Sequence, residues 1–457
     1  MFLDGLQYAT ISKNLAHGEG TFWHPHLSET WNKSGNEAFL EHPPLVFGIQ
    51  SLFFRLLGDS RFVERFYSFL TSLITALLII AIWRLIFRDK KHIRELEWFP
   101  VMLWIIIPIC FWSYQNNMQE NTMGIFTLGA VYAALKAITV ERYSVLNFVL
   151  SGTLIALAFL SKGLPGLFPF AMIPLYGIIH PETGIRKTVL FSSIILLTTT
   201  LLLVLIIFPY PAARESMTFW ITERVLGRIA EDRTTSNRFD VIWRVFTELI
   251  PSLILVCGIM FSQRKQLRKD IPVFAKDAIF FILVGLSATL PMVFTMVQKG
   301  FYLVPGFPFL ALGLALLCVP SLEKIFDKIH NNSLICKFFG SLSIVMLIAA
   351  IAFSVMQVNK FSRDENDISD VYKLGRVIEP QSTVGADVKL YNNWPFQLYM
   401  LRYFDISIEP NDLQSLKFYI AQKGDSTSVP ENYQKLKIDG LTTVDLYRKS
   451  EPNQAIH

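Results

Sequence analysis

Charged residues are scarce in this sequence. Asp, Glu, Lys and Arg make up 17% of the 457 residues and hydrophobic residues 52%, whereas typical globular domains carry about 25% charged residues. Mean hydropathy is +0.39. Gly (24) and Pro (22) are also few beside the 38 Phe, which favours long lipid-facing helices over the alternating strands of a membrane barrel. The composition therefore predicts an α-helical polytopic membrane protein embedded in a lipid bilayer.

Cysteine is scarce as well, and the net positive charge is small. The four cysteines (Cys110, Cys257, Cys318 and Cys336) lie in or beside apolar runs, where a thiol behaves as a small hydrophobic group, so we expect neither a disulfide framework nor a metal knuckle. The net charge of +5 comes from short basic clusters between apolar runs. We therefore expect no nucleic-acid partner. The sequence also has no tandem repeat or low-complexity tract.

Long apolar runs predict ten membrane spans. Several of them are close to the lower limit of about 17 residues for crossing a bilayer. The runs lie near residues 62–87, 99–115, 122–140, 145–160, 164–180, 188–209, 244–262, 277–297, 302–319 and 334–356.

Lys and Arg gather in every second loop, beginning with Arg88 to Arg94 and recurring at Arg264 to Lys269. Because basic loops stay on the cytoplasmic side, the opposite loops are predicted to face outward. These are residues 1–61, the turns near 116–121, 161–164 and 298–301, the loop 210–243 and the tail from 358. We predict a multi-pass protein of the inner (plasma) membrane whose outer loops lie on the periplasmic, extracytoplasmic side.

The tail has a different composition from the rest of the chain. Charged residues return from Phe361 onward, and β-rich runs such as STVGAD and KFYIAQ alternate with the helix-like NWPFQLYMLRYF. This pattern predicts a small soluble α/β domain. We therefore divide the chain into a transmembrane domain, residues 1–357, and an outer-face domain, residues 358–457.

The first outer loop begins with a short amphipathic helix. In LDGLQYATISKNL, Leu6, Tyr8 and Ile11 share one face, and Ser12 and Lys13 lie on the other. An acid, Asp4, stands in the first turn. There it could simply stabilise the positive end of the helix dipole by about 0.3–1 kcal/mol.

Further charged residues stand in the predicted outer loops, at helix ends. A carboxylate pair together with fixed cations suits a reaction in which a nucleophile loses a proton while a phosphate departs. Each charge taken alone has an alternative interpretation as an interfacial anchor whose end reaches water. The candidates are Asp4, Glu120, Lys162, Arg224, Arg228 and Lys299, with His24, His26, Glu41 and His42 in the first loop.

Several ordered landmarks resemble one family of membrane enzymes. DGLQYATISKNL, EHPPLVFGIQSLFFRLLG, QENTMGIFTLGAVYAALKA, LSKGLPGLFPF and KGFYLVPGFPFLAL are similar to the landmarks of GT-C glycosyltransferases of the protein O-mannosyltransferase and lipid A aminoarabinose-transferase type. The resemblance covers roughly residues 1–320. It implies transfer of a sugar from a polyprenyl-phosphate carrier to an acceptor on the outer face, which can be lipid A, another envelope glycan or a protein hydroxyl.

The resemblance assigns roles to the candidates. Asp4 becomes the catalytic base and Glu120 assists by positioning the acceptor, in a direct displacement that inverts the anomeric carbon. The basic residues would neutralise the departing phosphate, as a metal does in nucleotide-sugar enzymes, so we expect no metal and no organic cofactor beyond the lipid-linked sugar donor itself. The predicted substrate-binding residues are Tyr8, Glu41, His42, Lys162, Arg224, Arg228, Lys299 and Tyr302.

Two departures from the family pattern stand at the start of the chain. The family commonly has Asp-Glu where this chain has Asp4-Gly5, so a second carboxylate is absent. The family also has a spanning helix before the catalytic loop, and only three residues precede Asp4 here. We therefore expect the gene to encode, in frame and upstream of Met1, an apolar run of about 20 residues.

Three alternatives stay open at this stage. His24, His26, Glu41 and His42 carry side chains that suit zinc, although their spacing fits no strong metal pattern. A transporter or flippase for a lipid-linked glycan would place ionisable residues near the bilayer midplane on internal repeats, and neither feature is present. A catalytically inactive scaffold is the third alternative.

Overall fold

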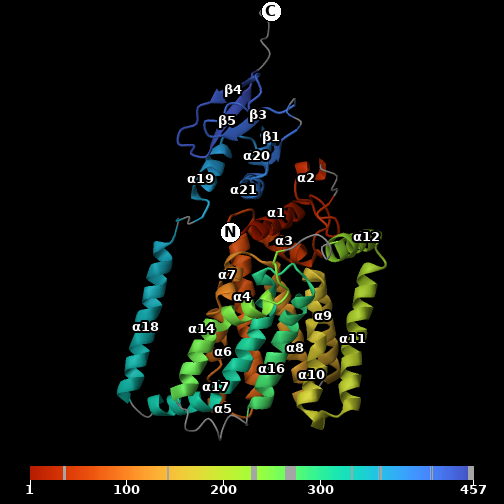
Figure 1. Cartoon of the computed structure of the whole chain (residues 1–457), viewed down its shortest axis with the longest axis vertical. Coiled ribbons are helices and arrows are strands. Elements are labelled where there is room, and N and C mark those ends of the chain that lie inside the picture. Colours follow the sequence, from red (N-terminus) through yellow and green to blue (C-terminus); the bar gives the residue numbers. More distant parts are fainter. Residues whose placement is uncertain are drawn as a thin grey trace, which may run out of the picture. The chain divides into compact units, whose positions relative to one another are not determined.

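Helices make up most of the computed structural model, which describes residues 1–33, 38–140, 144–227, 234–262, 274–330, 333–358, 360, 363–411, 413 and 415–450. The chain divides into two compact units. Unit 1 comprises Met1–Phe39, Gln50–Val63 and Leu342–His457, and unit 2 comprises Leu40–Ile49 and Glu64–Ser341. The two units are described separately (Figure 1).

Unit 2 is built from helices alone, as far as the described residues show. Its elements are α4 (Val63–Ile86), α5 (Lys91–Arg94), α6 (Trp98–Ile105), α7 (Pro108–Gln115), α8 (Gln119–Val140), α9 (Ser144–Lys162), η1 (Leu164–Ala171), α10 (Met172–Ile179), η2 (Pro181–Thr183), α11 (Ile185–Ile207), α12 (Pro211–Phe219), η3 (Trp220–Leu226), α14 (Asp240–Ser262), α16 (Ala275–Thr289), η5 (Leu290–Phe294), η6 (Gly300–Gly306) and α17 (Phe307–His330). The following helix, α18 (Ser333–Met356), runs from unit 2 into unit 1.

Among the described residues, eight helical segments are long and apolar enough to cross a membrane. A ninth is possible if the pair Lys91–Ile105 and Pro108–Gln115, bent by 81°, forms one span. The span predicted near 99–115 therefore corresponds to a pair of helices with a sharp bend between them. Pro108 begins α7 and its predecessor Ile107 is extended, as expected because proline excludes the residue before it from helical geometry.

The predicted span at 164–180 is also different in the structure. Residues Leu164–Ile179 form a shorter apolar helix, in which the first part, η1, is a 3₁₀ helix that contains Pro169. Proline lacks the amide hydrogen that a continuing α-helix needs. The other eight predicted runs coincide with the eight long apolar segments within a few residues, apart from α17, where the helical segment extends to Asp327.

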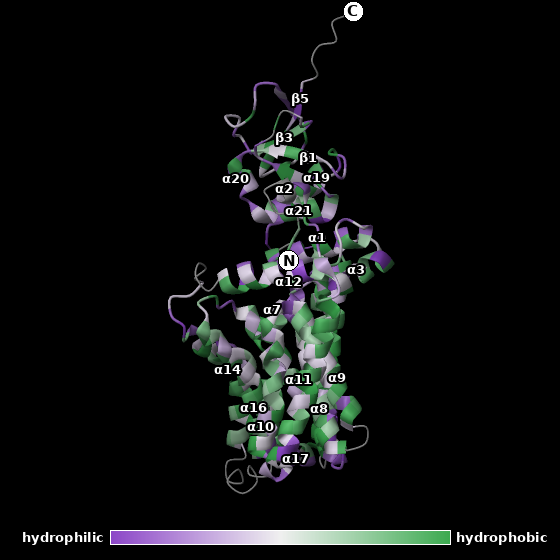
Figure 2. Ribbon diagram, turned by 90° about the vertical axis from the view of Figure 1, so that its right-hand side faces the viewer, coloured by the Kyte–Doolittle hydropathy of each residue, from purple (hydrophilic) through white to green (hydrophobic). Residues whose placement is uncertain are grey.

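The helices of unit 2 differ in how much of their surface is covered. In the most apolar window of Gly300–Asp327, 89% of residues are buried, whereas in α11 only 11% are. Helix α17 contacts α6, α14 and α16, and α8 packs along α9. Hydrophobic residues predominate along the helices of unit 2 (Figure 2), and exposed ones such as Leu197 and Leu201 of α11 are expected where the surrounding solvent is lipid.

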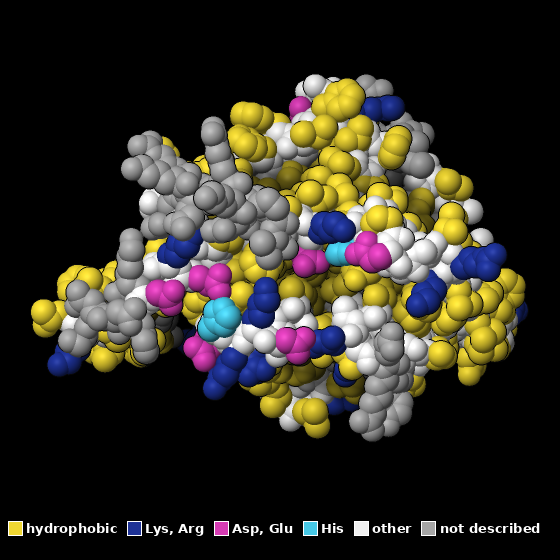
Figure 3. Space-filling view, turned by 90° about the horizontal axis from the view of Figure 1, so that it is seen from below, with side chains coloured by type: hydrophobic (Ala, Val, Ile, Leu, Met, Phe, Trp, Pro, Cys, Tyr) yellow, Lys and Arg dark blue, Asp and Glu magenta, His cyan; other side chains and the backbone are white. Residues whose placement is uncertain are grey.

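Charged side chains gather at the end of unit 2 where α5 and the C-terminal half of α17 lie (Figure 3). His92 of α5 lies 2.7 Å from Glu323 of α17. His180, at the end of α10, lies 3.5 Å from Asp277 of α16. These pairs connect segments that the alternating basic loops placed on one side of the membrane.

Unit 1 contains the predicted soluble α/β domain. Its helices are α1 (Leu3–His17), α2 (Glu29–Lys33), α19 (Glu365–Leu374), α20 (Val388–Tyr391) and α21 (Trp394–Phe404), and α3 (Leu45–Leu57) begins in unit 2 and continues into it. Its strands are β1 (Thr383–Ala386), β2 (Ser407–Glu409), β3 (Phe418–Gln422), β4 (Tyr433–Leu436) and β5 (Val444–Lys449).

The five strands form one mixed sheet in the order β2-β1-β3-β5-β4. β1 runs parallel to β2 and β3, with Val384 opposite Ile408. β3 and β4 pair antiparallel with β5, with Ile420 opposite Leu446. The parallel half is the half that needs helical crossovers, and α20 and α21 supply the connection between β1 and β2.

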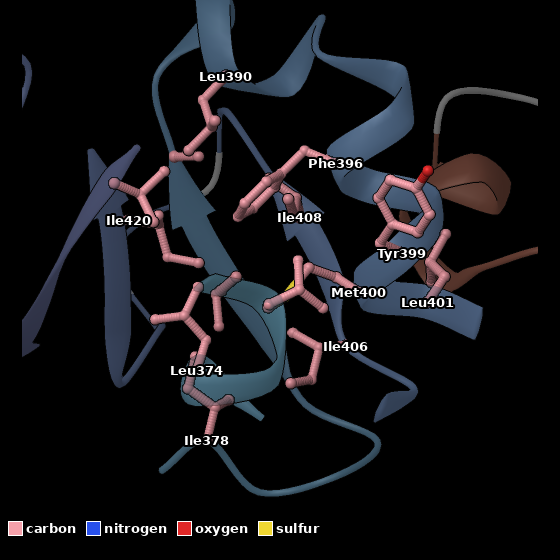
Figure 4. Close-up of a cluster of buried hydrophobic side chains, with 14 of the residues drawn as sticks. Leu374, Ile378, Leu390, Phe396, Tyr399, Met400, Leu401, Ile406, Ile408 and Ile420 are labelled. Atoms are coloured by element: carbon pink, nitrogen blue, oxygen red, sulfur yellow. The ribbon is translucent and has the colours of Figure 1, made fainter. Parts of the chain in front are cut away.

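Helix α1 shares the hydrophobic core of this sheet domain. Leu6 is fully buried in a cluster with Phe396, Met400 and Ile406; Figure 4 shows the part of this cluster contributed by the C-terminal residues. The polar face of α1 is buried as well, including Ser12 and Lys13, whereas the amphipathic pattern predicts exposure. The first outer loop and the C-terminal domain are therefore parts of one folded unit.

Candidate active site

The N-terminus of α8 presents four consecutive polar side chains, which contact residues of α4, α7 and α9. Asn121 exchanges two hydrogen bonds with Ser113 of α7, at 2.6 and 3.1 Å. The Thr122 hydroxyl lies 2.6 Å from the Tyr67 hydroxyl of α4. Gln119 and Glu120 face α9. The run QENT thus links four helices at one point inside unit 2.

Glu120 and Lys162 form a buried ion pair at this point. The Lys162 Nζ lies 3.3 Å from Glu120 Oε1 and donates to Gln119 Oε1 at 3.3 Å. Glu120 is 1% exposed and Lys162 7%. Each charge also has a favourable place on its own helix, because an acid in the first turn and a base in the last turn complement the helix dipole.

An aromatic ring and a glycine complete the surroundings of Lys162. Its ammonium lies 6.0 Å from the ring centre of Tyr302 in η6, within reach of a cation–π attraction. Gly163 follows at φ +83°, and a Cβ there would stand 2.1 Å from the Trp220 ring. Only glycine allows both this backbone and the close approach of Trp220, which ties η3 to the end of α9.

A second ion pair lies on η3. Arg224, about one turn beyond Trp220, pairs with Glu41, and both side chains are partly exposed. This part of η3 is a π-helix, an uncommon geometry that occurs frequently at functional sites. His42 beside Glu41 is partly buried, and the two prolines after it are buried. The ion pair thus holds the EHPP segment against η3, the helix that follows α12.

Lys299 lies in a separate cavity of unit 2. This cavity has a volume of about 230 Å³ and is lined by Thr234, Thr235, Arg244, Gln298 and Lys299, among others. Arg244 is a cation that the sequence analysis missed, because it is the first residue of the predicted span 244–262 and was counted as part of that apolar run. Its Nε lies 3.9 Å from Glu248. The cavity therefore brings two basic side chains together with two hydroxyls and the carboxylate of Asp240, which accepts a hydrogen bond from the Thr235 hydroxyl.

The remaining predicted site residues have different positions. Asp4 is in the first turn of α1 and partly exposed, and within the described part of unit 1 its carboxylate makes no hydrogen bond or ion pair. Tyr8, on the same helix, is 2% exposed. Arg228 lies outside the described residues. Among the described residues of either unit, no group of three or more His, Cys, Asp or Glu side chains is arranged to hold a metal ion.

Comparisons with known proteins lead to one group of transferases. Residues 41–210 match the family of dolichyl-phosphate-mannose-protein mannosyltransferases. Two relatives are undecaprenyl phosphate-alpha-4-amino-4-deoxy-L-arabinose arabinosyl transferases. The enzyme from Serratia proteamaculans is 23% identical over 79% of this chain, and the one from Proteus mirabilis is 23% identical over 76%. The match spans 63% and 60% of the length of these relatives.

The comparison of folds covers nearly the whole chain. ArnT from Cupriavidus metallidurans, solved bound to undecaprenyl phosphate, superposes with a TM-score of 0.64 and 12% sequence identity, covering 98% of this chain and 94% of that one. The apo structure of that protein gives the same values. The resemblance predicted from the sequence is thereby confirmed: this chain is a multi-pass membrane protein with the GT-C fold of the aminoarabinose transferase ArnT.

Proposed function

We propose that this protein is a membrane glycosyltransferase that moves a sugar from an undecaprenyl-phosphate-type carrier to an envelope acceptor. The observation that supports this most is the agreement of two independent comparisons. Sequence similarity over three quarters of the chain leads to undecaprenyl phosphate-alpha-4-amino-4-deoxy-L-arabinose arabinosyl transferases, and fold similarity over 98% of it leads to a protein solved bound to undecaprenyl phosphate. This favours a transferase over a transporter or flippase of lipid-linked glycans.

The reaction is a displacement at the anomeric carbon of the donor sugar. The acceptor hydroxyl oxygen forms a bond to that carbon while the bond from the carbon to the phosphate oxygen breaks. The hydroxyl proton passes to the Asp4 carboxylate, and the electron pair of the broken bond stays on the carrier phosphate, which leaves. Attack opposite the leaving group inverts the anomeric configuration. A partly exposed carboxylate with no partner in unit 1 suits a base that must meet an incoming substrate.

The basic residues of unit 2 divide into two groups in this proposal. Lys162 and Arg224 each have an acidic partner, Glu120 and Glu41; these pairs hold the acceptor-positioning carboxylate and the EHPP segment in place. Lys299 and Arg244 line one cavity together with Asp240, and Arg244 also lies 3.9 Å from Glu248; we assign to these two cations the neutralisation of the charge that develops on the phosphate. His42 and Arg228 are further phosphate ligands in the proposal, and Tyr302 screens Lys162.

We place the reaction on the extracytoplasmic side of the inner membrane. The support is the alternation of basic loops along the sequence together with the ion pairs that connect those loops at one end of unit 2. The acceptor is an envelope lipid such as lipid A, a glycan or a protein hydroxyl. We propose no metal requirement, since the charge on the phosphate is matched by side chains.

The test is sugar transfer by the purified protein in lipid, with undecaprenyl phosphate-linked 4-amino-4-deoxy-L-arabinose as donor and lipid A as the first acceptor. Asp4→Asn keeps size and polarity but removes the basic lone pair, so the transfer rate should fall by roughly 10²–10⁴-fold. Glu19→Gln, at a partly exposed acid just after α1, is the matched control and should transfer normally. Transfer by Asp4→Asn at the unmodified rate would exclude Asp4 as the base.

A further inference from the structure

Lys13 is a lysine buried inside unit 1, and its three ammonium hydrogens meet three acceptors. The side chain is 2% exposed. Its Nζ donates to the carbonyl oxygens of Leu401 and Arg402, at 3.4 and 3.2 Å, and pairs with the Asp405 carboxylate. All three acceptors belong to the last turn and C-cap of α21. Helix C-termini leave carbonyls without intrahelical partners, so a cation is well matched to this position.

A second buried cation, Arg402 of α21, contacts the other end of the first outer loop. Arg402 is 1% exposed and donates to the carbonyl oxygens of Asp59 and Ser60, at 3.2 and 3.0 Å. Its guanidinium lies 4.8 Å from the ring centre of Phe54. Because α3 ends just before this turn, helix α21 fixes both the beginning and the end of the loop that carries Asp4.

The segments that α21 holds also contact each other. His17, in the last turn of α1, lies 2.8 Å from the Asp59 carboxylate, and the Ser12 hydroxyl donates to Gln50 at 3.0 Å. Leu6 enters the core of the sheet domain from the same helix. Helix α1 is therefore attached along its whole length, from Leu6 to His17, within unit 1.

We propose that the C-terminal α/β domain acts as the positioning element of the reaction, with Lys13 and Arg402 as positioning residues for Asp4. This inference rests on the proposed function. Asp4 and Lys13 lie on one continuous helix, Leu3–His17, nine residues or about 14 Å apart along its axis. A shift of α1 against α21 therefore moves Asp4 by a similar amount, and a displacement of about 1 Å can cost a reaction roughly 10²-fold.

The chemistry of the contact favours positioning over mere adhesion. Burying two cations between helices carries a large desolvation cost, and apolar side chains of similar volume are often as stabilising. Directed hydrogen bonds to named carbonyls, in contrast, allow only one rotation and one axial position of α1. The sheet domain, which holds no predicted catalytic residue, thereby acquires a role in catalysis.

The experiment compares Lys13→Met, Lys13→Arg and the double variant Lys13→Met/Asp405→Leu with the surface variant Lys417→Met. All are full-length proteins in lipid, assayed with the donor and lipid A named above. We expect Lys13→Met to lower kcat by roughly 10²-fold with little change in the KM of the donor, as for an interaction that acts in the transition state. Lys13→Arg, which keeps the charge, should restore most of the rate, and Lys417→Met should match the unmodified protein.

The double variant separates positioning from folding. With both charges removed, the partly exposed Asp405 carboxylate is no longer left without its counter-charge, so amide hydrogen exchange should show the β-strands as well protected as in the unmodified protein. We expect its kcat to stay low and the amides of α1 to exchange faster. A double variant with the unmodified kcat would overturn the inference.

Amide exchange also distinguishes failure of this inference from failure of the proposed function. If the unmodified protein transfers no sugar to any acceptor, the proposed function fails, yet Lys13→Met should still accelerate exchange in α1 while leaving β1 to β5 protected. Unchanged exchange in α1 would overturn the inference whether or not transfer is observed.

Discussion

The buried pair of Glu120 and Lys162 allows a quantitative prediction about stability. Lys162→Met removes the ammonium and keeps most of the apolar stem, leaving Glu120, which is 1% exposed, without its cation. At a separation of 3.3 Å, the attraction in an effective dielectric of about 20 amounts to roughly 5 kcal/mol. The cost of desolvating both ions offsets much of this attraction. When Lys162 is removed, Glu120 still bears its desolvation cost but has lost the attraction that compensated for it. We expect the free energy of unfolding to fall by about 3–5 kcal/mol.

The reciprocal change should cost less. Glu120→Gln removes a buried charge while Lys162 keeps a second acceptor, Gln119 Oε1. The double variant Lys162→Met/Glu120→Gln has no charge at this point, so it should be more stable than Lys162→Met alone. Such non-additivity is the signature of direct coupling between two residues in contact.

The assay is reversible unfolding in mixed micelles, followed by tryptophan fluorescence, because Trp220 packs against Gly163 next to Lys162. Lys187→Met, at the exposed start of α11, is the matched control and should stay within about 0.5 kcal/mol of the unmodified protein, as most surface substitutions do. The reasoning is refuted if Lys162→Met falls in that same range, or if the effects of the two single changes simply add.

Three further predictions concern other parts of the chain. An enzyme reporter that works only outside the cytoplasm should be active when fused after residue 360 and inactive when fused near residue 269; the reverse result would contradict the proposed orientation. Gly163→Ala should destabilise the protein by about 1–3 kcal/mol, because the new Cβ would overlap the Trp220 ring, whereas Gly258→Ala, with open space around it, should not; equal unfolding midpoints would contradict this. Burial raises the pKa of Asp445, but hydrogen bonds from two lysines and a backbone amide outweigh it and hold that pKa below its usual value, so its stabilising contribution is present above the unfolded pKa of about 3.9. That contribution is lost as the pH falls through the folded pKa; amide exchange in β5 should therefore rise more steeply with acid in the unmodified protein than in Asp445→Asn, and parallel profiles would exclude this role.

Most of the membrane part could be predicted from the sequence alone. Apolar runs of sufficient length must become helices in lipid, because every backbone polar group has to be satisfied within the segment. The two predicted spans that are not one long helix in the structure, at 99–115 and 164–180, both contain a proline at the point where the regular α-helix is interrupted. Hydropathy measures the length of such a run and gives no information about a break within it.

The candidate residues at helix ends were also visible in the sequence, but their partners were not. The pattern identified Glu120 and Lys162 as separate charges at the ends of two predicted spans. Only helix packing decided that they face each other, since their positions are 42 residues apart and depend on how α8 lies along α9. The sequence did not indicate a binding role for Arg244, because a single base at the end of an apolar run resembles a snorkelling side chain.

The sequence by itself determined that this protein is a bundle of membrane helices with a small α/β domain at the end of the chain, because composition and periodicity are local properties. The role of Asp4, suggested by its place in a landmark of the family, stays a prediction. Only the tertiary structure decided that helix α1 belongs to the sheet domain. The polar face of α1 resembled a solvated surface in sequence, yet Lys13 is buried against carbonyls that lie 388 and 389 positions further along the chain. Such a contact depends on backbone carbonyl groups, which every residue carries, so no pattern of side chains in the sequence predicts it.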